Sequence, residues 1–306
     1  MQALLEAIAA LSLPADAQRL FHGRGGLYPG CEHLVLDAYP PVWVLTSFLP
    51  ITDADLATVH ASLNRRWQQL APAQALNWAF QCRHGGRAET RLMSGAVPDP
   101  MVVTEAGARF AVHPLRGQNH GLFLDMSEGR RWVQARNLAQ PGQKVLNLFA
   151  YTCAFSVVAL QAGARQVVNL DKSRGALAIG QHNHQLNGLR HGASFLPHDL
   201  FSSWGKLIRG GPYDLVIADP PSHQKGSFMA EKDYPRLMRR LPELLAPGGH
   251  ALLCLNAPEL GPDFVQAQMQ AQAPTLHFER RLPNPAVFAD VDEKRSLKVM
   301  LYRALD

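Results

Sequence analysis

The sequence has few cysteines and no long apolar run, and both absences narrow the class of protein. Its four cysteines lie far apart and form no C-x-x-C pair: Cys31, Cys82, Cys153 and Cys254. We therefore expect reduced thiols, and neither a zinc site nor a disulfide framework. The most apolar stretch, residues 145–164, is interrupted by Asn147, Thr152 and Gln161, so no membrane-spanning helix is expected.

The sequence has a slight excess of positive charge, and this excess is unevenly distributed. The 306 residues carry a net charge of +5; residues 1–115 hold 8 basic and 9 acidic residues, and residues 116–306 hold 22 and 16. A basic second half favours a polyanionic partner such as RNA, although an ordinary solvated surface explains so small an excess equally well. The N-terminus lacks a basic segment and carries Glu6, which predicts a helix instead of a signal peptide and hence a cytoplasmic protein.

The length and the apolar content of 47% predict two domains. Residues 1–115 show the pattern of a small α+β domain, with strand-like runs at 34–36 and 42–48 and a helical pattern at 52–70, where Thr52 or Asp53 would be the N-cap. Residues 116–306 alternate apolar runs with helical patterns, which predicts a doubly wound α/β domain.

Glycine is absent from the loop that joins the first strand and the first helix of the predicted second domain. Residues 144–148 read as a buried strand and residues 155–164 as a helix, yet residues 147–155 contain no glycine. A pyrophosphate cofactor needs G-x-G-x-x-G for close backbone approach, so NAD and FAD are disfavoured. S-adenosylmethionine (SAM), which has no phosphate, fits better. Asp171, at the tip of the next strand, can accept hydrogen bonds from both ribose hydroxyls.

Four motifs resemble those of the class I SAM-dependent methyltransferases of large-subunit ribosomal RNA, in particular the cytosine-5 and guanine-N7 enzymes. They are residues 147–155, Asp171–Ser173, Asn183 with Asn187-Gly188, and Asp219–Ser222. The family's loop usually reads Tyr-Thr-Gly-Gly-Phe; here Cys153 and Ala154 replace the glycines. The resemblance implies a Rossmann-like methyltransferase domain after a small domain that helps to hold RNA. Some relatives carry a further N-terminal RNA-binding module of the pseudouridine-synthase-associated type, which we do not expect in this protein.

The resemblance also implies a set of SAM-binding residues. Asp199 would meet the adenine amine, although an aspartate at a strand end is often only a cap. Residues 117–125 would contact SAM or serve as an ordinary interdomain linker, with His120 in a structural or positioning role. The expected cofactor residues are Phe123, Asp125, Asn147, Phe149, Ala150, Tyr151, Thr152, Cys153, Phe155, Asp171, Lys172, Ser173, Asp199, Leu200 and Asp219.

The catalytic residues are expected after the fourth and fifth strands of this domain. The prolines of Asp219-Pro220-Pro221 stiffen the loop and leave its acceptors free to clamp a flipped-out base, although proline pairs also simply end strands. Together with Asn256 these three are the expected catalytic residues. Nearby basic side chains would contact RNA phosphates or form a solvated helix face: Lys225, Lys232, Arg236, Arg239 and Arg240.

The product depends on Cys254 and Asn256. A cytosine-5 enzyme needs a cysteine nucleophile, which the resembling enzymes place seven residues after the Gly-Gly turn, where this sequence has Asn256. Cys254 falls inside the preceding apolar run, so we expect a core thiol and a base-nitrogen product, guanine N7 first. Three alternatives stay open: a cytosine-5 enzyme using Cys254, a non-catalytic RNA-binding or ribosome-assembly protein, and a nucleotide-dependent oxidoreductase.

Overall fold

The structure is a computed structural model that describes residues 1–221, 223–224 and 228–305. Contacts divide the chain into two compact units, Met1–Asp125 with Pro285–Asp292, and Met126–Asn284 with Glu293–Asp306. The sequence placed the division at residue 115. The next ten residues join the first unit because the backbone N–H of His113 donates to His120 O at 2.8 Å and Gln81 Nε2 donates to Gly117 O at 3.0 Å.

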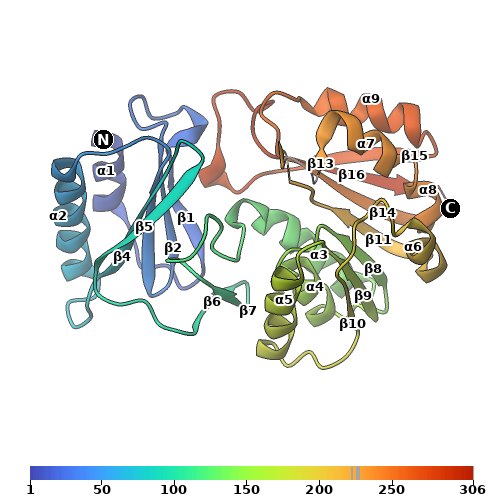
Figure 1. Cartoon of the computed structure of the whole chain (residues 1–306), viewed down its shortest axis with the longest axis horizontal. Helices are drawn as coiled ribbons and strands as arrows, with labels where there is room; N and C mark the ends of the chain where they lie inside the picture. Colours follow the sequence, from blue (N-terminus) through green and yellow to red (C-terminus); the bar gives the residue numbers. More distant parts are fainter. Residues whose placement is uncertain (222, 225–227, 306) are drawn as a thin grey trace. The chain divides into compact units, whose positions relative to one another are not determined.

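The first unit is built on a five-stranded sheet in the order β1-β2-β3-β4-β5. Its strands are β1 (Gln18–His22), β2 (Leu34–Tyr39), β3 (Val42–Ser47), β4 (Asn77–His84) and β5 (Arg87–Ser94). Helices α1 (Gln2–Ala10) and α2 (Asp53–Leu70) pack on the sheet face that carries Trp43 and Trp78 (Figure 1). Thr52 is the N-cap of α2, since its hydroxyl accepts a hydrogen bond from Asp55 N–H at 3.1 Å.

Two smaller elements complete the first unit. Strands β6 (Met101–Glu105) and β7 (Ala108–Val112) form a hairpin, which the turn-like sequence Glu105-Ala106-Gly107 between two apolar runs predicts. Residues 285–292, which contain the 3₁₀ turn η3 (Ala286–Phe288), return to this unit, and Val291 N donates to Gly25 O at 2.8 Å. The position of residues 283–293 between the last two strand-like runs of the sequence predicts a loop near the site; the structure assigns residues 285–292 of it to the first unit.

The second unit is a seven-stranded sheet in the order β10-β9-β8-β11-β14-β16-β15. All neighbouring pairs are parallel except those that involve β16. The strands are β8 (Lys144–Leu148), β9 (Gln166–Leu170), β10 (Ala193–Leu196), β11 (Tyr213–Ala218), β14 (Leu245–Leu255), β15 (Leu276–Leu282) and β16 (Lys298–Ala304). The expected doubly wound α/β fold is confirmed.

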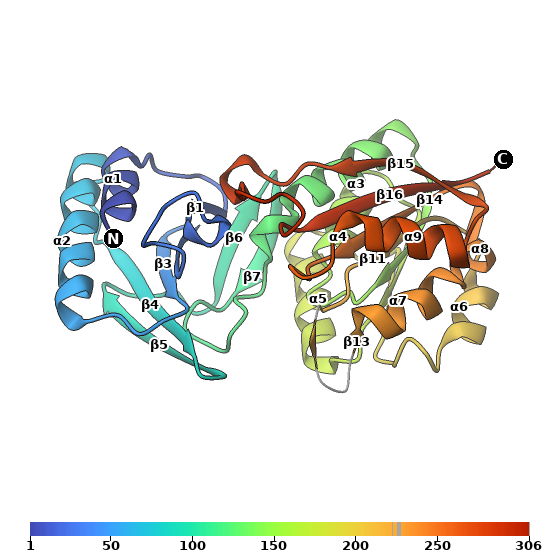
Figure 2. The same ribbon diagram turned by 90° about the horizontal axis from the view of Figure 1, so that it is seen from above.

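Helices cover both faces of this sheet (Figure 2). One face carries α3 (Ser127–Ala139), α4 (Ala154–Gln161) and α5 (Arg174–Leu186). Leu146 and Val216 lie on the other face, in one core with side chains of α6 (Trp204–Gly210), α7 (Ala230–Met238), α8 (Leu241–Leu244) and α9 (Pro262–Gln272). Both faces are buried, which is why the parallel strands read as continuous apolar runs. No helix within the described residues is long and apolar enough to cross a membrane.

One local prediction was wrong in part. The sequence pattern of residues 244–249 predicts a helix end and a turn; α8 does end at Leu244, but residues 245–249 already belong to β14. Leu245 pairs with Tyr213, and the register shifts before Leu215 pairs with His250. Residues 246–249 thus lie opposite Asp214 alone, and a local irregularity of the ladder accommodates the three extra residues, so the Pro-Gly-Gly segment remains in the strand.

Candidate active site

The candidate site lies where the parallel strands end. Strand β8 runs between β9 and β11, and the chain winds outward from it in both directions, so its carboxyl end is the switch point of the sheet. Leu148 pairs with Leu170 on one side and Ala218 on the other. The residues that follow these three positions, including Asp171 and Asp219, are therefore brought to one edge.

The loop after β8 holds a strained backbone. Phe149, Tyr151 and Cys153 have φ values of 56°, 46° and 61°, in the left-handed region that residues other than glycine seldom adopt. Such conformations cost about 1–3 kcal/mol each and persist only where the surroundings enforce them. Tyr151 N donates to Asp171 Oδ2 at 2.9 Å, and Asn183 Nδ2 donates to Thr152 O at 2.9 Å. Strain enforced at a switch point is typical of a ligand site.

Cys153 is accommodated by a glycine on the neighbouring helix. A Cβ on Gly180 of α5 would lie 2.5 Å from Cys153 Sγ, so only glycine leaves room for the thiol. Cys153 is fully buried, and burial, followed by the charge of Asp171, raises the pKa of its thiol. The side chain that replaces the usual glycine is thus an inert packing group and cannot act as a nucleophile at neutral pH.

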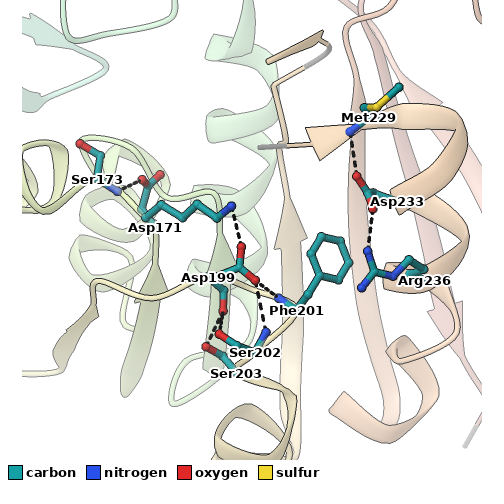
Figure 3. Close-up of polar contacts among 10 residues, drawn as sticks. Asp171, Ser173, Asp199, Phe201, Ser202, Ser203, Met229, Asp233 and Arg236 are labelled. Atoms are coloured by element: carbon teal, nitrogen blue, oxygen red, sulfur yellow. Dashed lines mark hydrogen bonds and ion pairs between the residues drawn. The ribbon is translucent and has the colours of Figure 1, made fainter. Parts of the chain in front are cut away.

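Asp171 is oriented by two backbone donors. Its Oδ2 accepts from Tyr151 N, and its Oδ1 accepts from Ser173 N at 2.7 Å (Figure 3). Each carboxylate oxygen has room for a second hydrogen bond, so the group can still accept from two ribose hydroxyls. Ser173 caps α5 by accepting from Ala176 N at 3.1 Å. The geometry therefore fits the role predicted for Asp171.

Lys172 and Asp199 join the tips of β9 and β10. Lys172 Nζ lies 2.6 Å from Asp199 Oδ2, and Asp199 Oδ1 accepts from the backbone N–H groups of Phe201 and Ser202 (Figure 3). Burial opposes ionisation of Asp199, but Lys172 and the backbone donors outweigh it and lower its pKa. Asp199 caps the following turn, the alternative left open by the sequence, and its contact with adenine stays a prediction.

A chain of buried hydrogen bonds runs beneath the strained loop. Asn147 Nδ2 donates to Asn169 Oδ1 at 2.9 Å, and Asn169 Nδ2 donates to Ser156 Oγ at 3.0 Å. Ser156 Oγ lies 2.8 Å from His184 Nε2, and His184 Nδ1 lies 2.7 Å from Gly180 O. Because a carbonyl only accepts, Nδ1 carries the proton, Nε2 accepts, and Ser156 donates to it. This series of hydrogen bonds fixes the orientation of the Asn147 side-chain amide near the end of β8.

Three members of this chain were not predicted from the sequence. Asn169, Ser156 and His184 are 0%, 0% and 3% exposed. Their only signal was a polar residue inside an apolar strand or helix, because buried polar groups need partners that a sequence does not show.

The loop after β11 lies beside an aromatic cluster. The Phe228 ring centroid is 5.2 Å from that of Phe149 and 5.1 Å from that of Tyr234. Tyr234 Oη donates to Cys254 O, at the end of β14. Cys254 is fully buried, whereas Asn256, two residues later, is exposed. Pro220 is buried and Asp219 is half-buried; Ser222 and Lys225, predicted as part of this site, lie outside the described residues.

The comparisons with known proteins agree with this site. Residues 18–303 match the sequence profile of the S-adenosylmethionine-dependent methyltransferase family. The chain belongs to this family. Its predicted cofactor, SAM, and the methyltransferase class are thereby confirmed, and the oxidoreductase alternative is set aside.

Curated relatives include the ribosomal RNA large subunit methyltransferase I of Aeromonas hydrophila, 35% identical over 231 residues, which make up 72% of this chain and 56% of the relative. The ribosomal RNA large subunit methyltransferase of Deinococcus radiodurans is 32% identical over 254 residues, 76% of this chain and 58% of the relative. The chain thus spans a little over half the length of these relatives.

Solved structures show the same fold. A Streptococcus mutans chain described as a SAM-dependent methyltransferase has a TM-score of 0.82 at 23% identity, with 99% of this chain and 81% of that chain covered. A second solved methyltransferase structure, complexed with SAH, has a TM-score of 0.80 at 23% identity and covers 99% and 79%. The class I Rossmann-like architecture expected from the sequence is confirmed.

The remaining predicted cofactor residues of this methyltransferase have varied surroundings. Phe123 is 42% exposed and belongs to the first unit, as does Asp125 in the 3₁₀ turn η2 (Leu124–Met126). Four others are buried in the second unit: Ala150, Thr152, Phe155 and Leu200. Their contacts with SAM remain predictions.

The arginines predicted to bind RNA phosphates all have partners within the chain. Arg236 Nη1 donates to Asp233 Oδ1 at 2.9 Å, and its guanidinium carbon lies 3.8 Å from the centroid of the Phe201 ring (Figure 3). Arg239 donates to Gln272, and Arg240 pairs with Glu243. Lys232 is exposed. Phosphate contact by these arginines would have to share or displace the present partners.

Proposed function

We propose that this protein methylates a base of large-subunit ribosomal RNA in the cytoplasm, with guanine N7 as the methylated atom. The support for ribosomal RNA is the similarity to curated ribosomal RNA large subunit methyltransferases. The observation that carries the choice of atom is the contrast at the end of β14, where Cys254 is fully buried and Asn256 is exposed.

The chemistry of the two bases explains why this contrast matters. Carbon 5 of cytosine becomes nucleophilic only after a thiolate adds to the ring. The Cys254 thiol lies within a strand whose backbone is paired on both sides, to β11 and to β16. Guanine N7 already has a lone pair and needs only alignment. The exposed Asn256 amide offers donors and an acceptor for the edge of a base.

The residues present fit a SAM site. Asp171 presents two carboxylate oxygens oriented by backbone donors, and the Asn147 amide is held by its hydrogen bond to Asn169. The strained loop follows β8 directly. Bound SAM would supply an electrophilic methyl group to the N7 lone pair, with S-adenosylhomocysteine as the other product. In this proposal, Asp219 and the stiff Pro220-Pro221 segment hold the base in line with that bond.

A methylation assay with product analysis tests the proposal. The protein is incubated with tritiated SAM and large-subunit ribosomal RNA, and the nucleosides are identified by mass spectrometry. We expect 7-methylguanosine, formed at an unchanged rate by Cys254→Ser. Cys31→Ser is the matched control, because Cys31 is equally buried but lies in the first unit. Abolished transfer in Cys254→Ser alone, with 5-methylcytosine from the wild type, would establish the cytosine-5 alternative.

A non-catalytic RNA-binding role is the remaining alternative. The replacement of two glycines in the loop was its only support, and Gly180 accommodates the larger Cys153 side chain. A wild-type protein that binds the RNA but transfers no tritium would support this alternative and end the catalytic proposal.

A further inference from the structure

The two faces of the first unit's sheet differ in character. Successive side chains of a strand point to opposite faces, and the face that carries Trp43 and Trp78 packs on α1 and α2. The alternate positions of the same strands are mixed: buried Val35, Val44 and Ala79 lie among the polar residues Arg19, Asp37, Thr46, Gln81 and Arg83. Asp37 is 5% exposed and Gln81 is 0% exposed. Burying polar groups costs free energy unless they form hydrogen bonds or ion pairs within the protein or with a ligand.

One pair on this face is neutralised. Arg19 donates to both carboxylate oxygens of Asp37, at 2.7 and 3.1 Å, and lies directly across the β1–β2 ladder from it. Its remaining terminal nitrogen donates to His22 Nδ1 at 2.8 Å. The Arg19–Asp37 pair therefore has no net charge to offer a ligand.

Two other arginines remain uncompensated. The guanidinium carbons of Arg24 and Arg83 lie 4.2 and 5.9 Å from the centroid of the same ring, Phe48. Among the described residues, Arg24 makes no hydrogen bond or ion pair, and Arg83 makes one hydrogen bond, from Nε to Gln81 Oε1. Arg24 is exposed and Arg83 is half-buried, so both side chains reach the protein surface.

Two carboxylates act on the charged side chains of this face: Asp37, which is paired with Arg19, and Asp125, whose negative charge also acts on Arg19. Burial, followed by the positive charges of nearby arginines, lowers the pKa of His22 and of His120 to about 4, so both rings are neutral at pH 7. His120 Nε2 and Thr46 Oγ1 are buried without a hydrogen-bond partner within the described residues. The three arginines, Arg19, Arg24 and Arg83, and the two carboxylates, Asp37 and Asp125, leave this face with a net charge of one positive.

We propose that Arg24 and Arg83, held on the ring of Phe48, bind phosphate groups of the RNA strand. A guanidinium stacked on an aromatic ring keeps its N–H edges free and rigidly placed, which suits the paired oxygens of a phosphate. Two such groups on one ring match neighbouring phosphates of one strand. The site rests on the proposed function for RNA as the ligand; inorganic phosphate shares the recognising chemistry.

The first experiment measures RNA affinity as a function of salt. A fluorescein-labelled hairpin from large-subunit ribosomal RNA is titrated with the full chain between about 50 and 200 mM salt, because each lost phosphate contact reduces the slope of log K against log salt by about 0.7–0.9. We expect Arg24→Gln with Arg83→Gln to reduce that slope by about 1.5 and to weaken binding about equally for unrelated RNA sequences.

A matched variant separates this site from a general loss of charge. Arg65 is an exposed arginine of α2, and it makes no hydrogen bond, ion pair or ring contact within the described part of the chain. Arg65→Gln should leave the slope nearly unchanged, and SAM affinity should be unchanged in every variant. A slope in the double variant equal to that of Arg65→Gln would overturn the site while leaving RNA as the substrate.

A second experiment distinguishes the sources of phosphate. Inorganic phosphate is added to the wild-type complex at constant ionic strength, with chloride as reference. Millimolar binding of phosphate to the free protein that is lost in the double variant but does not reduce RNA affinity would show a site for the free ion alone and overturn the assignment to an RNA strand; we expect phosphate and chloride to compete alike. Binding of SAM without any RNA affinity in the wild type would overturn both this site and the proposed RNA substrate.

Discussion

Replacement of Asp171 by alanine tests the cofactor site most directly. In the structure each oxygen of this carboxylate already accepts one backbone hydrogen bond, at 2.9 Å from Tyr151 and 2.7 Å from Ser173. The remaining lone pairs would accept from the two ribose hydroxyls of SAM. Hydrogen bonds to a charged group contribute about 1.5–3 kcal/mol. Asp171→Ala should therefore weaken SAM binding by at least about tenfold.

The assay must separate loss of affinity from loss of fold, because Asp171 also holds the strained loop. Asp214→Ala is the matched control: the Asp214 carboxylate accepts from the backbone N–H of Lys144 at 2.7 Å, at the opposite end of β8. Urea denaturation should show that both variants lose about 1–3 kcal/mol of unfolding free energy. Calorimetry with SAM should show weakened binding for Asp171→Ala alone. Equal SAM affinity in a folded Asp171→Ala protein would refute the assignment.

Three further perturbations test other parts of the structure. Asp219→Ala should leave SAM affinity nearly intact while single-turnover methylation falls about 10²-fold, the scale of lost positioning; an equal loss of SAM affinity would make Asp219 a cofactor residue. Ser156→Ala should lower the unfolding free energy by about 1–3 kcal/mol, measured in urea, because it leaves buried polar atoms of Asn169 and His184 unpaired. An unchanged midpoint of urea unfolding would show that these hydrogen bonds do not stabilise the fold. His120 has a pKa of about 4 in the fold against 6.5 when unfolded, so the unfolded state binds more protons between these values and stability falls as pH drops from 6.5 towards 4, by about 3 kcal/mol at most. Because His22 has a pKa of about 4 as well, His120→Gln should reduce this pH dependence without abolishing it, and a profile identical to the wild type would show that His120 does not contribute.

The sequence by itself determined the elements of the second unit and the cofactor class. Both faces of its sheet are buried, so β8, β9 and β11 appear as apolar runs that local pattern identifies. The glycine-free loop excluded a pyrophosphate, and Asp171 follows its strand directly. The predicted N-cap Thr52 was also confirmed. Its capping hydrogen bond joins residues only three positions apart in the sequence, so a local pattern reveals it. These features are local, and local features are encoded in short stretches of sequence.

Tertiary structure decided everything that depends on contact between distant residues. Only the packing of α5 on the loop shows that Gly180 makes room for Cys153, and only the pairing of β8 with β9 connects Asn147 through Asn169 and Ser156 to His184. The return of residues 285–292 to the first unit and the gathering of Arg24 and Arg83 on Phe48 likewise join residues far apart in the chain. Propensity and periodicity describe a residue's own neighbourhood, whereas burial, pairing and unpaired charge are properties of the folded chain.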